Sequence, residues 1–164
     1  MDESLAEALE REHREIDAGV EAFQAGVAVG ENRTEQLLAA IGALRRHIYL
    51  EEEFLFPPMR STGLMAPVFV MVREHGEMWR TLDALVPLLA ADASSPEVLS
   101  ALSDLVSQLQ SHNPKEEQIL YPQADAVLDA DAGQRLAALI ATGTLPDGWE
   151  CEGVRAGAKA TPFG

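Results

Sequence analysis

The chain has 164 residues, enough for one domain with a sizeable core, and 47% of them are apolar, which argues against disorder. Its formal net charge is −15, from 27 acidic and 12 basic residues, so its surface repels nucleic-acid phosphates and anionic membranes, and neither is an expected partner. Aromatic residues make up only 5%, whereas Ala, Leu and Glu are plentiful, and this balance favours helices over sheets.

Compartment signals are few. Cys151 is the single cysteine, so no intrachain disulfide can form. The N-terminal residues are acidic and amphipathic, unlike a secretory signal, and no stretch approaches the roughly eighteen apolar residues of a membrane span. We therefore expect a soluble cytoplasmic protein.

Four long segments carry apolar side chains at steps of three and four residues, which is typical of one helix face. The first covers 5–27 and ends near Gly26 and Gly30, and the second covers 37–54 and stops around 57–58. The third covers 68–89, with Pro67 in its first turn, and the fourth covers 98–119. Ser95 and Pro96 fit the N-cap and the first position of the fourth helix.

The breaks at 30–33, 61–64 and 92–95 are short, so consecutive helices should be antiparallel neighbours. The fold class is therefore all-α, an up-down-up-down antiparallel four-helix bundle over residues 1–126. A short fifth helix over 130–141, closed by Gly143, and an irregular tail from Thr144 fill residues 127–164, packed on or extending from the same domain. Pro114 lies inside the fourth pattern, where the helix either kinks or ends and restarts.

The apolar stripes contain polar residues that do not belong in a core. All four histidines of the chain lie on these stripes, and two are followed four residues later by glutamate, as His47 by Glu51 and His112 by Glu116. That spacing places both side chains on one side of a helix. Burying two uncompensated carboxylates would cost several kcal/mol each, and a multivalent cation is the simplest compensation.

The chain also repeats itself, and the repeat strengthens the metal-site interpretation. Residues 47–57 match residues 112–122 in the pattern His-x3-Glu-Glu-x2-Leu-Phe/Tyr-Pro, and Arg-Glu-His occurs at both 11–13 and 73–75. Two such helix pairs facing each other bring four histidines and two glutamates to one level of the core, as in helical bundles that bind two metal ions.

Taken singly, each element has a plainer explanation. A buried histidine is more often a hydrogen-bonded core residue, and a His-x3-Glu pair is more often an exposed helix pair. Glu52, Glu53 and Glu117 are assigned on this basis as carboxylates that are solvated or that support the ligands. A purely structural bundle with buried polar networks is the corresponding alternative for the whole chain. The combination, at matched heights in four helices, favours the metal site.

The pattern His13 … His47-x3-Glu51 … His75 … His112-x3-Glu116 resembles the hemerythrin-like (HHE cation-binding) family, as do the segments HIYLEEEFLFP, REHGEM and HNPKEEQILYP. The resemblance covers residues 5–125. It implies two iron ions, one bound by His13 and His47 and the other by His75 and His112. Glu51 and Glu116 would bridge them, with an oxo or hydroxo group as a third bridge. Imidazole and carboxylate also suit manganese and zinc, so iron rests on the family likeness.

One departure from the family matters. Oxygen-carrying hemerythrins place a further histidine four residues after the one that corresponds to His75, and here that position is Trp79. Asp17 stands at the equivalent place after His13, as an extra ligand or, as we favour, a hydrogen-bond acceptor beside the ligands. Phe54 lies seven residues after His47 and is expected to wall the site without ligating. Tyr49 and Tyr121 fall on other helix faces and are interpreted as structural.

Both irons would then have exchangeable positions, which would admit hydrogen peroxide, nitric oxide or dioxygen. The leading interpretation is a di-iron oxidoreductase with peroxidase- or catalase-like activity in detoxification. No catalytic residue beyond the metal site is identified. The alternative is a protein that binds, stores or senses oxygen or nitric oxide without turnover. Turnover of hydrogen peroxide distinguishes the two.

Overall fold

The computed structural model describes residues 2–160, of which 158–160 are described by their backbone only. The described residues form helices and no strands, so the prediction of an all-α chain is confirmed. In chain order the elements are α1 (Leu5–Ala28), α2 (Thr34–Leu50), the π-helix η1 (Glu51–Leu55), α3 (Phe56–Arg60), α4 (Met65–Ala91), α5 (Pro96–Lys115), the π-helix η2 (Glu116–Leu120), α6 (Tyr121–Val127), α7 (Ala130–Thr142) and α8 (Glu152–Ala160).

Short polar side chains set where several helices begin. Ser4 and Glu7 form a capping box at the start of α1, in which each side chain binds the other residue's backbone N–H. The predicted N-cap of α5 is confirmed, because the Ser95 hydroxyl accepts the backbone N–H of Val98 and Pro96 follows it. Each such cap stabilises its helix by about 1 kcal/mol.

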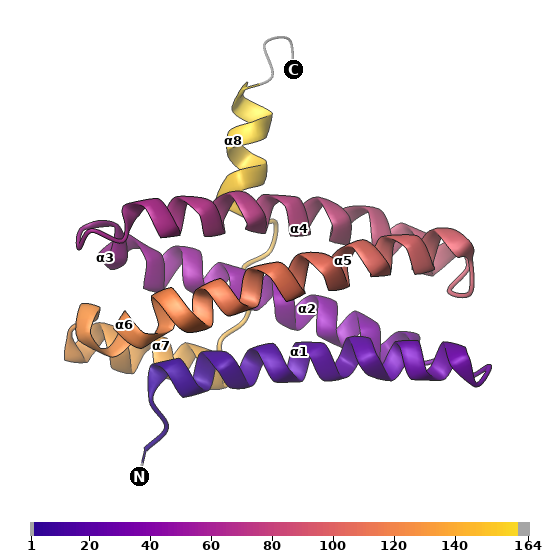
Figure 1. Cartoon of the computed structure of the whole chain (residues 1–164), viewed down its shortest axis with the longest axis horizontal. Coiled ribbons are helices and arrows are strands. Elements are labelled where there is room, and N and C mark those ends of the chain that lie inside the picture. Colours follow the sequence, from indigo (N-terminus) through magenta and orange to yellow (C-terminus); the bar gives the residue numbers. More distant parts are fainter. Residues whose placement is uncertain (1, 161–164) are drawn as a thin grey trace.

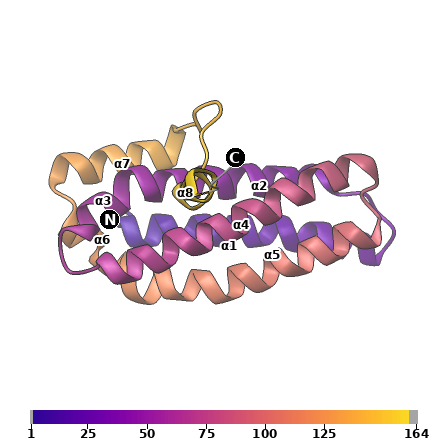
Figure 2. The same ribbon diagram turned by 90° about the horizontal axis from the view of Figure 1, so that it is seen from above.

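The four long helices, α1, α2, α4 and α5, lie along the longest axis of the molecule, and each runs back beside the one before it (Figure 1). α7 lies beside one end of α2, and α8 stands at a steep angle to α4, as the view from above shows (Figure 2). No helix in the described part of the chain is long and apolar enough to cross a membrane.

The interior is built from two apolar clusters. The first cluster fills the space between the long helices at one end and includes Ile16, Leu44, Leu82 and Leu105. The other packs the opposite end, around Leu9 and the short helices α3, α6 and α7. His13, His75, His112 and Glu116 lie in sequence between residues of one cluster and residues of the other, and His47 and Glu51 lie close to the change from one cluster to the other, so a polar layer separates two blocks of core.

Two π-helices interrupt the long helices at matching points of the repeat. The backbone N–H of Phe56 bonds to the carbonyl of Glu51, and that of Tyr121 bonds to the carbonyl of Glu116, five residues earlier in each case. A π-turn places residues i and i+5 on one face, and such turns are frequent at functional sites. The wide turn changes the helix face that every later residue occupies.

The proline pair at 57–58 does not stop the second helix, contrary to the prediction. The helical path of α2 continues through η1 into α3 and ends at Arg60, because the proline pair at 57–58 occupies the first turn of α3, where a missing N–H costs little. Pro114 lies within α5, which continues to Lys115, so the helix does not end and restart there.

The prediction for the C-terminal segment was partly wrong. α7 matches the expected fifth helix and has Gly143 at its C-cap, but the segment expected to be irregular contains α8, which packs on α4. A Cβ added to Gly76 would lie 3.1 Å from the Cα of Gly153, so two glycines permit this close approach. Just before α8, Cys151 is fully buried. A backbone contact of this kind leaves no periodic pattern in the sequence.

Candidate metal centre

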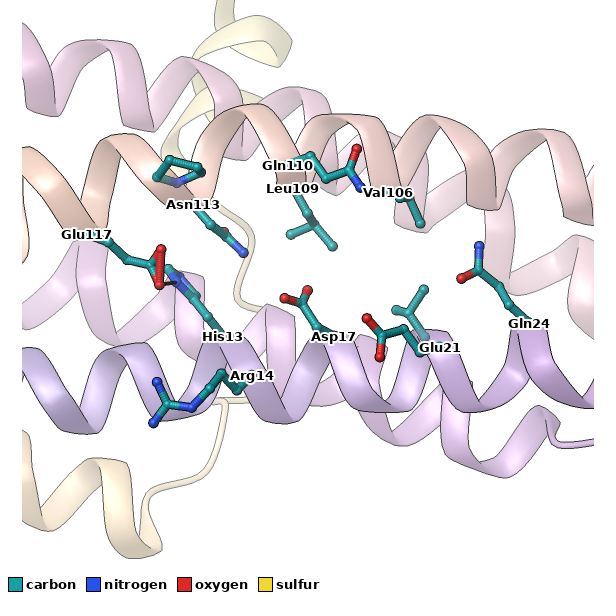
Figure 3. A pocket seen from close by; sticks show the side chains of 12 residues that line it. His13, Arg14, Asp17, Glu21, Gln24, Val106, Leu109, Gln110, Asn113 and Glu117 are labelled. Carbon is teal, nitrogen blue, oxygen red and sulfur yellow. Dashed lines mark ion pairs between the residues drawn. The ribbon is translucent and has the colours of Figure 1, made fainter.

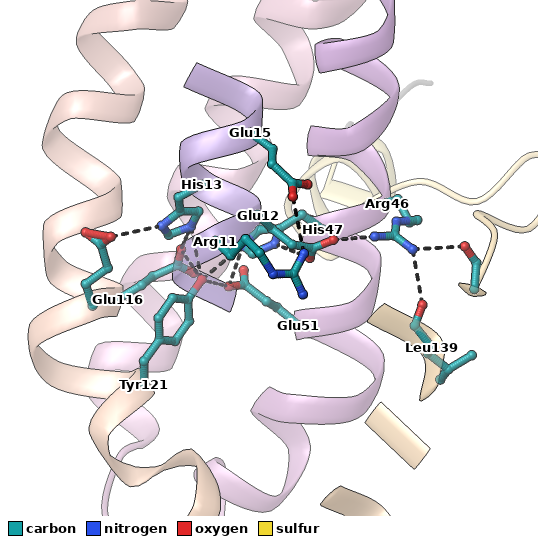
Figure 4. Close-up of polar contacts among 12 residues, drawn as sticks. Arg11, Glu12, His13, Glu15, Arg46, His47, Glu51, Glu116, Tyr121 and Leu139 are labelled. Carbon is teal, nitrogen blue, oxygen red and sulfur yellow. Dashed lines mark hydrogen bonds and ion pairs between the residues drawn. The ribbon is translucent and has the colours of Figure 1, made fainter. Parts of the chain in front are cut away.

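Six side chains converge in the polar layer between the apolar clusters, and they are the six that the sequence predicts as ligands. Each is at most 3% exposed, and they come from α1, α2, η1, α4, α5 and η2: His13, His47, Glu51, His75, His112 and Glu116. Figure 4 shows His13, His47 and the two glutamates turned toward one another. The long helices bring residues up to 103 positions apart (116 − 13) into one cluster.

The six residues form two groups of potential metal donors, each with ligand atoms within 4.8 Å of one another. One group contains His13 and His47, and the other contains His75 and His112. Glu51 and Glu116 belong to both. The structure thus pairs the histidines in the way that the resemblance implied.

The two glutamates lie between the histidine pairs. Glu51 places Oε1 3.0 Å from His47 Nε2 and Oε2 3.1 Å from His75 Nε2, so each oxygen faces a different pair. Glu116 Oε1 lies 3.2 Å from His13 Nε2 and 3.1 Å from His112 Nε2, and its Oε2 lies 3.6 Å from His75 Nε2. Both carboxylates can therefore contact two ions at once.

A carboxylate stands at the outer nitrogen of each histidine. His47 Nδ1 lies 2.9 Å from Glu12, His75 Nδ1 lies 2.7 Å from Glu52, and His112 Nδ1 lies 2.9 Å from Glu74. His13 Nδ1 has its nearest carboxylate, that of Glu117, at 3.6 Å. An Nδ1–H bond to a carboxylate fixes the ring and directs the Nε2 lone pair inward. This arrangement suits metal-binding histidines.

Two of these four carboxylates, Glu12 and Glu74, were not predicted from the sequence. Glu12 and Glu74 directly precede candidate ligands on their own helices, but each serves a histidine on the following helix, and Arg46 and Lys115 hold the outer oxygens. The available signal was the repeated Arg-Glu-His triplet. Glu52 and Glu117 fit the supporting role considered for them, and the exposed Glu53 instead accepts a hydrogen bond from the Trp149 indole.

The buried histidines and carboxylates of this layer stabilise each other's charged forms. Burial opposes the charged form of His47, but the carboxylates of Glu51 and Glu12 outweigh burial and raise the histidine's pKa to about 10. Burial likewise opposes ionisation of Glu116, yet the neighbouring histidines, His112 foremost, hold its pKa well below the usual range. Without a metal ion, protons on the histidines compensate the carboxylates, and bound metal would displace those protons.

The structure corrects the interpretation of Tyr121. Its hydroxyl lies 3.0 Å from Nε2 of both His13 and His47, and it donates to Glu51 Oε1 at 2.5 Å (Figure 4). An α-helical count from Glu116 places Tyr121 on another face, but the π-turn of η2 returns it to the face of the glutamate. Burial, together with Glu116 and Glu51, raises the pKa of the phenol well above its ordinary value.

The same π-turn effect corrects the position of Phe54. Its ring lies 5.7 Å from the ring of Tyr49 and under the guanidinium of Arg135, rather than against the candidate ligands. Phe56, five residues after Glu51, takes that place and stacks on His75 with ring centroids 5.6 Å apart. Phe56 and Tyr121 are equivalent residues of the internal repeat.

One cavity reaches the cluster from outside. It has a volume of about 380 Å³, lies between α1 and α5, and is lined by His13, Asp17, Asn113 and Glu117 among others (Figure 3). Burial raises the pKa of Asp17 in its wall. Asp17 thus lines the cavity next to His13, and its role as a ligand or a hydrogen-bond acceptor stays a prediction.

Four buried atoms of the six side chains have no hydrogen-bond partner: His13 Nδ1, His75 Nε2, Glu51 Oε2 and Glu116 Oε2. Unpaired buried polar atoms are costly and rare, and the described residues contain one other, Gln108 Oε1. Imidazole nitrogens and carboxylate oxygens are donors that iron, manganese and zinc accept. The residues therefore fit a pair of metal ions.

Comparison with protein families agrees with this geometry. The model of the hemerythrin HHE cation-binding domain matches residues 4–124, which is most of the chain. The chain belongs to the hemerythrin HHE cation-binding family. The matched residues include every candidate ligand, whereas α7 and α8 lie outside the match.

This hemerythrin-family chain also resembles curated proteins named iron-sulfur cluster repair protein YtfE. Those of Yersinia pestis (strain Pestoides F) and Yersinia pseudotuberculosis (serotype O:1b) are each 31% identical over 100 residues, covering 54% of this chain. The chain spans less than half of each relative, 45% of its length. No solved structure matches the chain significantly.

Trp79 marks the departure from oxygen-carrying hemerythrins. Its ring is 3% exposed, lies edge-on to Trp149 with centroids 5.5 Å apart, and carries the guanidinium of Arg45 over its face. In this hemerythrin-family chain, the position that could have supplied another imidazole packs the core instead.

Proposed function

We propose that this chain binds two iron ions in an antiparallel four-helix bundle formed by α1, α2, α4 and α5, and that it reacts with small oxidants. His13 and His47 would hold one iron and His75 and His112 the other, with Glu51, Glu116 and an oxo or hydroxo group as bridges. The proposed activity is peroxidase- or catalase-like removal of hydrogen peroxide, with nitric oxide and dioxygen as further reactants.

The observation that carries this proposal is the sharing of two carboxylates between two histidine pairs. Glu51 directs one oxygen to His47 and the other to His75, at 3.0 and 3.1 Å. A single-ion site has no need of such sharing, and a structural polar network should leave fewer unpaired atoms than this cluster has. Helical bundles that bind metal pairs use inward ligands from all four helices in the same way.

The bound irons would supply exchangeable coordination positions and a change of oxidation state. The chain's own residues hold the histidine rings in register through Glu12, Glu52 and Glu74 and keep bulk water away with the two apolar clusters. The cavity beside His13 is large enough for a small oxidant, and Asp17, whose pKa is raised by burial, lies in its wall and could deliver a proton.

The first test is the iron, manganese and zinc content of freshly purified protein, together with its visible spectrum. Two irons per chain with an oxo-bridged ferric spectrum support the proposal. A protein with little metal that folds equally well with a chelator contradicts it, because ligand bonds coupled to folding must add stability.

Activity separates the enzyme from the alternative, a protein that binds, stores or senses oxygen or nitric oxide. The di-iron protein should evolve oxygen from hydrogen peroxide or oxidise an added electron donor over many turnovers. A binding protein would change its spectrum once, in proportion to the metal, and then stop. The Glu51→Ala variant serves as the control for free iron.

The similarity to proteins named for iron-sulfur cluster repair favours a second candidate function, participation in the repair of damaged clusters. The relevant assay adds the di-iron protein to an enzyme with an oxidised iron-sulfur cluster and follows recovery of that enzyme's activity. Recovery at the rate given by free ferrous iron alone would exclude this role.

A further inference from the structure

Tyr121 stands where the donor atoms of one proposed metal position converge. Its hydroxyl oxygen lies 3.0 Å from Nε2 of both His13 and His47, 2.5 Å from Glu51 Oε1 and 3.2 Å from Glu116 Oε1. These four neighbours are the donor residues of the first group described above. The side chain is fully buried, so solvent does not compete for the hydroxyl.

Hydrogen bonding accounts for only part of this position. A phenol has one proton to donate, whereas the Glu51 and Glu116 carboxylates can only accept while ionised. The bond to Glu51 uses that proton, so the hydroxyl oxygen meets Glu116 Oε1 at 3.2 Å with no phenol proton between them. A cation bound by all of these atoms would remove the conflict.

Apart from the short contact with Glu51, the distances also match the edges of one coordination sphere. Donor atoms bound about 2.1 Å from one ion and at right angles to one another lie about 3.0 Å apart. The hydroxyl oxygen is at 3.0 Å from both histidine nitrogens, His47 Nε2 is 3.0 Å from Glu51 Oε1, and His13 Nε2 is 3.2 Å from Glu116 Oε1. The phenol oxygen therefore occupies the position of a ligand.

The geometry points to Tyr121 as a further ligand of the metal ion held by His13 and His47. This inference rests on the proposed function, since it requires the metal centre. The phenol proton leaves to solvent as the ion binds, as it does from other ligands that bind deprotonated. The first ion then has two imidazoles, two shared carboxylates and a phenolate.

The second ion lacks this ligand. Phe56, the residue equivalent to Tyr121 in the repeat, stacks on His75 and cannot bind a metal. The two ions would therefore be inequivalent, with one protein ligand fewer at the ion of His75 and His112.

The test compares three proteins loaded with ferrous iron and oxidised in air: the natural chain, Tyr121→Phe and Tyr49→Phe. The chain has two tyrosines, so Tyr49→Phe is a matched control that leaves the site intact. The readouts are iron content, the visible charge-transfer band of phenolate bound to ferric iron, and tyrosine vibrations in resonance Raman spectra. A fourth protein combines Tyr121→Phe with Phe56→Tyr.

We expect the band in the natural chain and in Tyr49→Phe, its complete loss in Tyr121→Phe, and its return in the double variant, where the phenol adjoins the other ion. Two irons per chain without a phenolate band in the natural protein would contradict Tyr121 as a ligand but would still support the metal centre. A band that persists in Tyr121→Phe at full iron content would contradict Tyr121 as a ligand as well. Failure of the natural chain to take up iron would overturn the proposed function itself.

Discussion

The carboxylate of Glu52 connects His75 with the C-terminal segment of the chain. Glu52 Oε2 lies 2.7 Å from His75 Nδ1, and Glu52 Oε1 accepts the backbone N–H of Glu152 at 2.8 Å. The Glu52 side chain is 2% exposed and that of His75 is fully buried. The segment that leads into α8 thus helps to orient a candidate metal ligand, although it lies outside the region matched by the family model.

Replacing Glu52 by glutamine should weaken metal binding without unfolding the chain. Glutamine keeps the shape but loses the negative charge that strengthens His75 as a donor, and changes of this kind cost about 10–100-fold in metal affinity. Competition with a chelator measures the effect. Glu53→Gln, one residue later and exposed, should keep the natural affinity; equal losses in both variants would contradict the role of Glu52.

Replacing Gly76 by alanine should release the C-terminal segment from α4. The added Cβ would lie 3.1–3.2 Å from the backbone of Gly153, and neither backbone can yield easily. The single cysteine, Cys151, is fully buried beside this contact, so its rate of modification by a thiol reagent reports the release. The rate should rise at least about tenfold, equivalent to about 1.4 kcal/mol of lost docking energy.

Gly42→Ala is the matched control for this experiment, because Gly42 is exposed in α2 and a Cβ there would meet no atom within 4 Å. Alanine should stabilise that helix by about 0.5–1 kcal/mol and leave the thiol protected. Slow modification of Cys151 in the Gly76→Ala variant would show that the segment accommodates the methyl group.

Either Glu51→Ala or Glu116→Ala should lose both metal ions, not one. Each carboxylate lies within 3.6 Å of histidines from both pairs, so its removal withdraws a donor from both ions and leaves their mutual repulsion unbridged. Metal analysis after gel filtration is the measurement, with Glu53→Ala as the control. A variant that retains one tightly bound ion would contradict the bridging roles.

The metal-free protein should lose part of its stability in acid through Glu74. The hydrogen bond from His112, followed by that from Lys115, holds the pKa of Glu74 at about 2, below its ordinary value of 4.5. A lowered pKa in the folded state means that the contribution is present above the ordinary pKa and disappears as the pH falls toward about 2.

Glu74→Gln removes this contribution, so we expect the variant to be less stable by about 1–2 kcal/mol at neutral pH. Thermal unfolding at a series of pH values is the measurement. The difference in melting temperature between the variant and the natural chain should shrink as the pH falls below about 4.5. If the difference in melting temperature instead stays constant down to the lowest pH at which the chain folds, the effect of the substitution does not come from the charge of Glu74.

The positions of the six candidate ligands could be predicted because α-helical spacing is strict and local. His47 and Glu51 lie one turn apart in any α-helix, and the repeat puts His112 and Glu116 in the same relation. Short loops with turn residues likewise indicate where one helix ends and the next begins, as at 92–95.

The same spacing failed immediately after each glutamate. A π-turn adds about one residue to the helical repeat, so an α-helical count assigns every later residue to the wrong face. This error put Phe54 at the site and Tyr121 outside it, whereas the structure has Phe56 and Tyr121 there. Nothing in the local sequence distinguished a π-turn from ordinary helix.

Helical periodicity and the cost of burying charge indicated which residues face inward and suit a metal ion, because both are properties of a single helix. Which carboxylate supports which histidine depends on how the helices pack, since Glu12 and Glu74 each bind a histidine on the neighbouring helix. The packing also places Tyr121 in only one half of the repeated site and brings the backbones of Gly76 and Gly153 together where α8 meets α4. Those relationships depend on distances between segments far apart in the chain, which no spacing within one segment records.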